Sequence, residues 1–258
     1  MENSLDVKIS ENIKREIEQS GKSKSEIAKA MNMHKNYSYV MAPSKETAKF
    51  YSEAFKIEKN KIFINSLPRI DYLLDKSLTE EKIKEFYKQY PTYKNKKTIL
   101  YVPTFRKNND CTEIINKIVE CIDFKKYNLI IKLHPLDITP DKELYTVDKK
   151  YDTYDLLKIA DYVITDYSSI AFEASLLKKQ LYFYMYDIED YTEKRGLNFN
   201  IFKEMSSSTK NNINEIIELI ENEQYDYKQL ENFKVKYMGD DNSNSTSKLI
   251  DFIFNILN

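Results

Sequence analysis

The chain is poor in glycine, a residue that most phosphate-binding loops need. Its 258 residues include three glycines, and these lie far apart at positions 21, 196 and 239. The Walker loop and the GxGxxG dinucleotide turn both require several glycines close together, so the sequence excludes both. Any phosphate site must therefore be built from side chains and the end of a helix.

Cysteine is also scarce. Cys111 and Cys121 are the only two cysteines, and they fall within one expected helix, too far apart along it to form a disulfide. With no Cys-x-x-Cys pair, the composition favours a reduced, cytoplasmic setting. Two histidines and no paired-carboxylate motif predict no dedicated metal site, and we expect no cofactor.

Long apolar runs and an excess of charge of one sign are absent as well. No run approaches the roughly 20 residues of a membrane span, and the first residues lack the apolar core of a signal peptide. Forty basic residues face 41 acidic ones, so no overall field favours nucleic acid. Residues 22–40 resemble a helix-turn-helix superficially, but Asn32 replaces the turn glycine, and we expect no nucleic-acid partner.

What the chain does contain, from about residue 37, is an alternation of apolar strands with amphipathic helices. Strands are expected near 37–41, 61–64, 98–102, 128–133, 144–147, 161–165 and 180–184, with helices between most of them and further helices near 211–221, 226–236 and 245–257. This alternation predicts an α/β fold with a parallel sheet covered on both faces.

The segment YVITDYSSIAFE, residues 162–173, is the most informative. A buried strand runs directly into a helix N-terminus, where Asp166, Ser168 and Ser169 stand and where an anion can bind. These residues could simply cap the helix. Two serines, however, provide one more donor than capping requires. Glu173, one turn later, could accept from ribose hydroxyls or be an ordinary surface charge.

Two other polar clusters follow strands. In KLHP, Lys132 and His134 come just after a strand, and a histidine there can donate to phosphate or act as an acid or base. The alternative is a loop histidine bonded to backbone. In PTFR, Thr104 and Arg106 follow another strand. In such sheets, binding sites lie at the carboxyl ends of the strands, so we expect these clusters to meet.

Arginine is rare in this lysine-rich chain, which makes Arg106 and Arg195 candidates for phosphate contacts. The planar guanidinium binds phosphate with two parallel hydrogen bonds, which lysine cannot do. The alternative for each is a salt bridge. Arg195 precedes Gly196, which indicates a shaped loop.

Taken in order, the segments YVMAPSKETAKFYSEAFKI, LPRIDYLL, ILYVPTFR, LIIKLHP, TDYSS and YTEKRG resemble the CDP-glycerol glycerophosphotransferase family, the teichoic acid polymerases and primases. The resemblance implies a GT-B transferase of two Rossmann-like lobes that needs no metal. It implies that His134, Ser168 and Ser169 hold the diphosphate of CDP-glycerol, assisted by Arg106 and Arg195, with Glu173 at the ribose. It also implies that His134 stabilises the departing CMP.

The sequence departs from the family in two places. The His-Gly motif and the Pro-Leu-Lys-type segment of the family's N-terminal lobe, which supply the base, have no counterpart, and Ser66 stands where the family usually has glycine. We therefore expect a partial N-terminal acceptor lobe over residues 1–70, a Rossmann-like donor lobe over 71–240 and a C-terminal helix over 241–258.

The function expected from this resemblance is transfer of glycerol phosphate, or a related polyol phosphate, from a CDP-linked donor. The acceptor would be a lipid-linked or polymer hydroxyl, and a second chain could supply the missing part of the lobe. The protein is expected in the cytoplasm, and peripheral association with the inner membrane face is left open. Two alternatives remain: a non-catalytic nucleotide-binding module, and another GT-B enzyme such as a glycosyltransferase or nucleotide-sugar epimerase.

Overall fold

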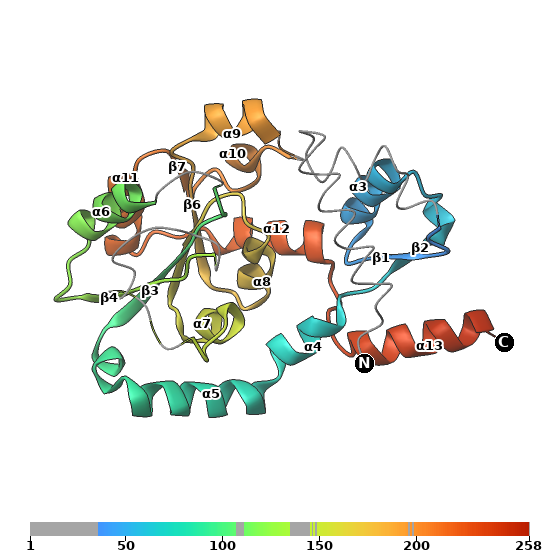
Figure 1. The fold of residues 1–258 in the computed structure, drawn as a ribbon, viewed down its shortest axis with the longest axis horizontal. Coiled ribbons are helices and arrows are strands. Elements are labelled where there is room, and N and C mark those ends of the chain that lie inside the picture. Colours follow the sequence, from blue (N-terminus) through green and yellow to red (C-terminus); the bar gives the residue numbers. More distant parts are fainter. Residues whose placement is uncertain are drawn as a thin grey trace, which may run out of the picture.

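The computed structural model of the protein describes residues 36–106, 111–134, 145, 147, 149–195, 197 and 199–257, with the side chains of 194 and 195 left out. The described residues form two parallel sheets joined by helices (Figure 1). The strands are β1 (Val40–Ala42), β2 (Ile62–Ile64), β3 (Lys97–Val102), β4 (Tyr127–Ile131), β5 (Tyr162–Thr165), β6 (Gln180–Tyr184) and β7 (Thr209–Lys210).

The helices connect these strands and cover the larger sheet. They are α3 (Lys45–Phe55), α4 (Pro68–Leu74), α5 (Lys76–Gln89), α6 (Thr112–Cys121), α7 (Thr153–Ile159), α8 (Ile170–Leu176), α9 (Ile188–Arg195), α10 (Ile201–Glu204), α11 (Ile213–Glu221), α12 (Tyr227–Met238) and α13 (Ser245–Leu257). Two short 3₁₀ helices lie at Lys59–Lys61 and Pro91–Asn95. The predicted α/β fold with parallel sheets is confirmed.

The larger sheet has the strand order β4-β3-β5-β6-β7, and all of its pairings are parallel. Alternate residues of each strand enter two separate cores. On β3, Leu100 packs with α5, α7, α8 and α12, whereas Ile99 packs with α6 and α11 on the other face. Figure 1 shows α6 and α11 on one side of this sheet and α7, α8 and α12 on the other. Burial on both faces explains why these strands read as continuous apolar runs.

The smaller unit consists of β1, β2 and α3, and it packs on the larger unit through α12. The Thr47 hydroxyl of α3 donates to the Tyr237 carbonyl at 2.9 Å. Gly239, which ends α12 at φ +78°, lies so close to this unit that a Cβ there would stand 2.8 Å from the Pro43 carbonyl oxygen. Only glycine tolerates both this dihedral angle and this contact.

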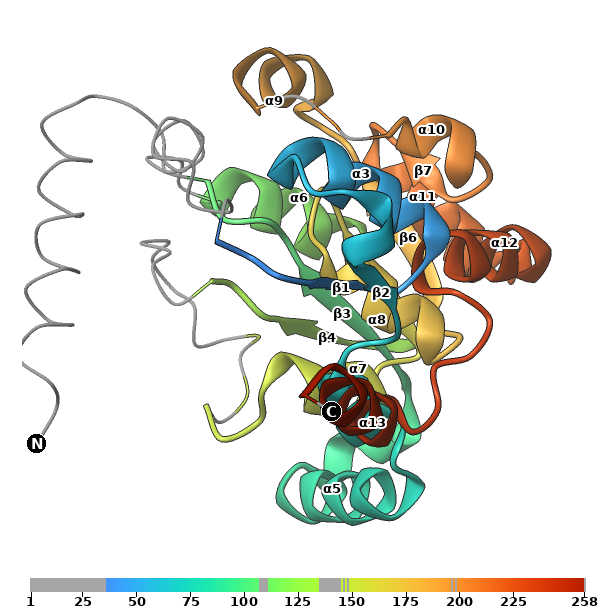
Figure 2. The ribbon, with the colours of Figure 1, turned by 90° about the vertical axis from the view of Figure 1, so that its right-hand side faces the viewer.

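Helix α13 returns to the smaller unit after the larger sheet is complete, as Figure 2 shows. The Asp71 carboxylate of α4 accepts from the backbone N–H groups of Ser245 and Thr246 at 2.8 and 2.7 Å and so caps α13. Asn65 donates to the Ser245 carbonyl at 2.9 Å. These contacts fix the start of α13 against residues that lie more than 170 positions earlier in the chain.

The expected strands and C-terminal helices match the observed elements closely, but several other elements differ. Helices α4, α9 and α10, the two 3₁₀ helices and the two-residue strand β7 were not anticipated. The strand expected near 144–147 lies largely outside the described residues, and its two described members, Tyr145 and Val147, are not in a strand. The expected helices before residue 36 also lie outside the described residues. Among the described helices, none is both long and apolar enough to cross a bilayer.

Candidate functional site

The strand order creates a crevice at the carboxyl ends of β3 and β5. The connection after β3 leads through α6 to β4 on one side, and the connection after β5 leads through α8 to β6 on the other. Because the two connections diverge, the ends of β3 and β5 border an open space, and ligands of such sheets bind there. Thr104 and Arg106 follow β3, and Asp166, Ser168 and Ser169 follow β5, so the structure brings these five predicted residues to one edge of the sheet.

Asp166 joins the loop after β3 directly to the loop after β5. One of its carboxylate oxygens, Oδ1, accepts from the Thr104 backbone N–H at 2.8 Å and from the Thr104 hydroxyl at 2.6 Å. The Tyr167 backbone N–H donates to the same oxygen at 2.6 Å. The side chain is almost completely buried. Asp166 therefore ties the loop after β5 to the loop after β3.

Arg106 is held by the protein at every nitrogen of its guanidinium. Nη2 donates to Asp166 at 2.9 Å, Nε donates to Asp187 at 2.9 Å, and Nη1 donates to the Thr104 carbonyl at 2.7 Å. Its side chain is 7% exposed. The carboxylates raise the pKa of Arg106 even though burial alone would lower it. This arrangement favours the salt-bridge alternative, in which Arg106 ties together the loops after β3, β5 and β6.

Aromatic rings enclose the same guanidinium. The rings of Tyr167 and Tyr191 stack at 3.5 Å, and each centroid lies 5.0 Å from the Arg106 Cζ. The Tyr167 hydroxyl donates to Asp187 at 3.0 Å. Burial, together with the charge of Asp187, raises the pKa of Tyr167, which therefore stays protonated at neutral pH. Asp187, which follows β6, and Tyr191 were not among the predicted site residues.

Ser168 and Ser169 remain accessible at the start of α8. Ser168 Oγ accepts from the Ile170 N–H at 3.4 Å, and the Ser169 side chain makes no capping hydrogen bond. Both line a cavity of about 390 Å³ that also borders α3, α4, α9 and α12. A volume of this size is suited to a nucleotide-sized ligand. The cavity therefore lies between the smaller unit and the larger sheet, and the two serines open into it.

Glu173 lies in the wall of this cavity, but it does not stand free. It is buried, and its Oε1 accepts from Arg69 Nη2 at 2.9 Å and from Arg69 Nε at 3.2 Å. Arg69 was missed at the sequence level. It is one of only four arginines in the chain, and Pro68 before it is a typical first residue of a helix. The rarity of arginine and the helix start that Pro68 indicates could therefore have singled out Arg69.

Lys132 and His134 are not among the described residues that line the cavity. Lys132 donates to the Tyr151 carbonyl at 3.0 Å. His134 is exposed, and its ring centroid lies 5.0 Å from that of Phe105, which places it at the same edge of the sheet. Arg195 ends α9, and its side chain is outside the described residues. The roles predicted for these residues stay predictions.

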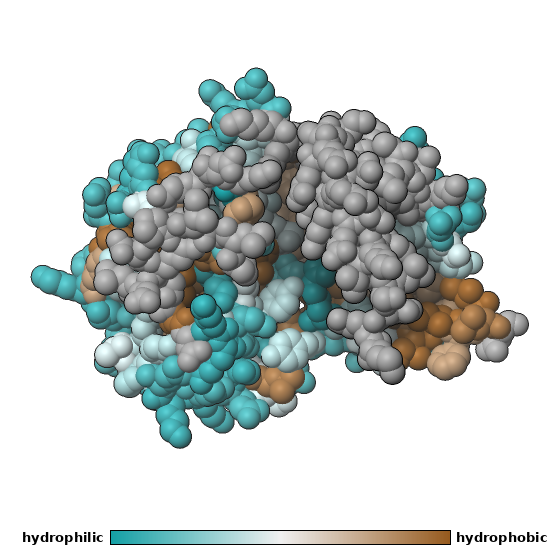
Figure 3. Space-filling view, in the orientation of Figure 1, coloured by the Kyte–Doolittle hydropathy of each residue, from teal (hydrophilic) through white to brown (hydrophobic). Residues whose placement is uncertain are grey.

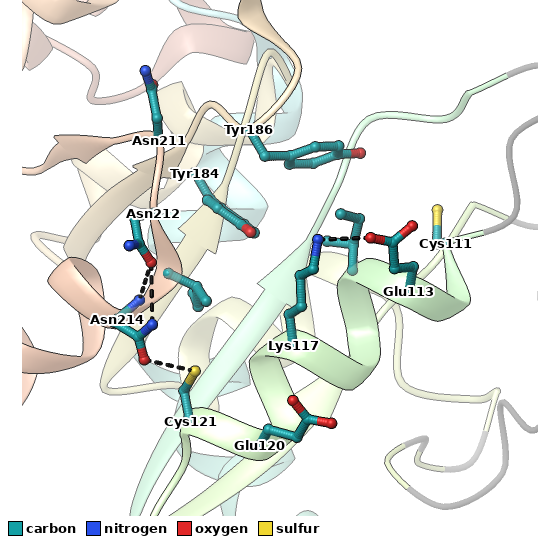
Figure 4. A pocket seen from close by; sticks show the side chains of 12 residues that line it. Cys111, Glu113, Lys117, Glu120, Cys121, Tyr184, Tyr186, Asn211, Asn212 and Asn214 are labelled. Carbon is teal, nitrogen blue, oxygen red and sulfur yellow. Dashed lines mark hydrogen bonds and ion pairs between the residues drawn. The ribbon is translucent and has the colours of Figure 1, made fainter.

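A second, larger hollow of about 880 Å³ lies between α6 and the start of α11 (Figure 4). Its lining includes the ion pair of Lys117 with Glu113 at 2.7 Å and the contact of Cys121 with Asn214 at 3.0 Å. Both cysteines are unbridged. None of the predicted site residues whose side chains the structure describes lines this hollow, so the smaller cavity is the better candidate site. Among the described residues, no group of three or more histidine, cysteine or acidic side chains is arranged to hold a metal ion.

Comparison with known proteins identifies a family. The sequence pattern of the CDP-glycerol:poly(glycerophosphate) glycerophosphotransferases matches residues 11–255. A teichoic acid ribitol-phosphate primase of Bacillus spizizenii is 31% identical over 245 residues, and a teichoic acid glycerol-phosphate primase of Bacillus subtilis is 29% identical over 249. These matches cover 90% and 92% of this chain but 63% and 62% of the relatives, so the chain spans about three fifths of their length.

Solved structures share the fold. The wall teichoic acid polymerase TagF superimposes with a TM-score of 0.72 at 21% identity, over 91% of this chain and 62% of the polymerase. A TagF variant soaked with CDPG gives a TM-score of 0.73 at 22% identity, over 91% of this chain and 61% of the variant. A UDP-GlcNAc 2-epimerase from Neisseria meningitidis gives a TM-score of 0.54 at 19% identity, over 84% of this chain and 62% of the epimerase.

Proposed function

We propose that this chain, which belongs to the CDP-glycerol:poly(glycerophosphate) glycerophosphotransferase family, is the donor-binding part of a transferase that moves a polyol phosphate. The donor is CDP-glycerol or a related CDP-linked polyol, and the acceptor is a hydroxyl of a teichoic acid or capsule-type polymer. The observation that carries the proposal is the cavity at the carboxyl ends of β5 and β6, with Ser168 and Ser169 opening into it.

The proposed reaction is a substitution at the β-phosphorus of the donor. The acceptor oxygen forms a bond to that phosphorus, the bond to the CMP oxygen breaks, and the hydroxyl proton passes to a base. Catalysis of this kind depends on positioning and on neutralising phosphate charge. His134 and the two serines are the proposed contacts to the diphosphate, with Arg195 assisting. The buried network of Thr104, Asp166 and Arg106 would hold their loops in place.

The arrangement of lobes is also a proposal. We propose a partial acceptor lobe over residues 1–70, a donor lobe over 71–240 and a C-terminal helix over 241–258. The two separate sheets support this division, with the boundary inside α4. We further propose that the remaining acceptor-side segment, with its base, comes from additional polypeptide. Adding the N-terminal segment of a relative to the purified chain should then raise turnover, and no increase would contradict this part.

Binding measurements test the donor assignment. In calorimetric titrations of the purified chain, CDP-glycerol and CDP should bind about 10- to 100-fold more tightly than UDP, because a cytosine-selective site leaves buried polar groups unpaired with uracil. Lys117→Gln, in the larger hollow, should leave this binding unchanged. Equal or tighter binding of UDP would favour a nucleotide-sugar enzyme instead. CDP binding without turnover, even after the acceptor-side segment is added, would favour the nucleotide-binding module.

Peripheral association with the inner membrane face is a further part of the proposal. Helix α13 exposes a row of apolar side chains, visible as the brown surface in Figure 3, and Phe254 is 61% exposed. Such a row can enter the boundary of a lipid surface. Phe254→Glu should lower co-sedimentation with anionic vesicles severalfold. Asn255→Glu adds the same charge beside it and should have a smaller effect. Equal effects, or no binding by the unaltered chain, would contradict this part.

A further inference from the structure

Arg69 and Glu173 form an ion pair across the wall of the candidate site. Arg69 lies in the first turn of α4, beside the smaller unit, and Glu173 lies in α8 of the larger unit. Although 104 positions separate them, Arg69 Nη2 and Nε both donate to the same oxygen of Glu173, at 2.9 and 3.2 Å. The pair therefore links α4 to α8 in the wall of the cavity.

The two partners differ in burial, which indicates what each contributes. The Glu173 side chain is 4% exposed, whereas the Arg69 side chain is 50% exposed. A buried carboxylate needs a cation or several donors, and Arg69 provides this compensation. The guanidinium is held in place but still reaches the cavity. Tyr154 is a further hydrogen-bonding neighbour, but a guanidinium has more N–H donors than these two partners use.

The charges that line the cavity favour a role for Arg69 in ligand binding. Among the described residues that line it, Arg69 is the one basic side chain, beside two carboxylates, Asp166 and Glu173. Asp166 is neutralised by Arg106, whose own nitrogens are all engaged and whose side chain is closed off from solvent. An anionic ligand in this cavity thus meets the accessible edge of Arg69 in the space that Ser168 and Ser169 also line.

We infer that Arg69 is a ligand of the donor's phosphate groups and that Glu173 is a positioning residue that orients Arg69. This inference rests on the proposed donor site and deepens it. It replaces the predicted contact of Glu173 with the ribose by an indirect role. It also transfers to Arg69 the phosphate contact predicted for Arg106. The fork of a guanidinium fits a phosphate group with two parallel hydrogen bonds, so the geometry suits this ligand class.

Comparison of ligands with and without phosphate tests the role of Arg69. Arg69→Gln should weaken binding of CDP about 10- to 100-fold, as expected for loss of charge-assisted hydrogen bonds, and leave binding of cytidine unchanged. Arg69→Lys keeps the charge but not the planar guanidinium, so its CDP affinity should lie between those of the unaltered chain and Arg69→Gln. Lys84→Gln removes one positive charge from an exposed position on α5 and serves as the matched control. Unchanged CDP binding by folded Arg69→Gln would overturn the inference.

A double-mutant cycle tests the role of Glu173. Glu173→Gln alone should weaken CDP binding severalfold, because the guanidinium loses its orientation, and should have no further effect when Arg69→Gln is already present. The double variant also removes both charges together, which keeps the buried site neutral and the chain folded. If Glu173→Gln weakens cytidine binding in both backgrounds, Glu173 touches the ribose and the positioning role is wrong.

The same titrations separate this inference from the proposed function. UDP carries the same diphosphate as CDP, so Arg69→Gln should weaken both nucleotides equally. Tighter binding of UDP than CDP would overturn the proposed donor while leaving the role of Arg69 intact. CDP-selective binding that Arg69→Gln leaves unchanged would overturn the role of Arg69 alone. Absence of any nucleotide binding by the unaltered chain would overturn both.

Discussion

Arg106→Met is expected to lower the free energy of unfolding by about 3–5 kcal/mol, the typical cost of breaking a buried ion pair by removing one partner. The guanidinium compensates Asp166 and Asp187 at 2.9 Å each, and the Asp166 side chain is almost completely buried. Without it, both carboxylates must find water or protons, and the loops after β3, β5 and β6 lose their common anchor. Urea unfolding followed by circular dichroism measures this cost.

A matched variant separates the effect of removing a buried charge from the effect of removing any charge. Lys117→Met also removes one partner of an ion pair, but that pair is exposed on α6, and exposed pairs contribute little to stability. The loss of unfolding free energy caused by Arg106→Lys should lie between those of the two methionine variants, because lysine keeps the charge but cannot bridge both carboxylates. If Arg106→Met costs no more than Lys117→Met, the network of Arg106 is not a structural anchor.

His134→Ala is expected to lower turnover about 10²- to 10³-fold, the usual effect of removing one group that stabilises developing charge. His134 stands beside Phe105 at the edge of the sheet where the site lies, and it is exposed enough to approach a bound diphosphate. Its proposed contact is with the charge that grows on the departing CMP, so turnover should fall more than the affinity for CDP-glycerol.

The other histidine provides the comparison for this experiment. His34→Ala makes the same chemical change at a position that matches no motif of the family. Release of CMP from CDP-glycerol, measured with a lipid-linked or polymer acceptor, reports turnover, and calorimetry reports affinity. Should His134→Ala leave both unchanged, the role assigned to His134 is wrong.

Much of the larger unit could be predicted from the sequence because its strands and helices carry local patterns. Strands β3, β5 and β6 each contain a continuous run of apolar residues, since both faces of the sheet are covered. Strand β7 has two residues, too few for any periodicity to be recognised. Helix α4 was missed because the segment before it suggested a strand, although Pro68 stands at its start.

The sequence predicted where three of the site residues lie, but it did not predict the residues that Arg106 contacts. The sequence placed Thr104, Arg106 and Asp166 at the ends of strands, and the structure has all three there. Rarity and chemistry suggested that Arg106 binds phosphate. Its carboxylate partners lie 60 and 81 positions away, and only the pairing of β3 with β5 and β6 with β5 brings them close.

The sequence by itself determined the alternation of strands and helices, the carboxyl-end clusters and the family, because each of these depends on residue types at short spacings. Only the tertiary structure decided the strand order β4-β3-β5-β6-β7, the cavity between the two units and the difference in burial between two arginines. Arg106 is enclosed by carboxylates and rings, whereas Arg69 remains half exposed and lines the same cavity as the two serines. Burial depends on which distant segments pack around a side chain, and that information arises only when the chain is folded.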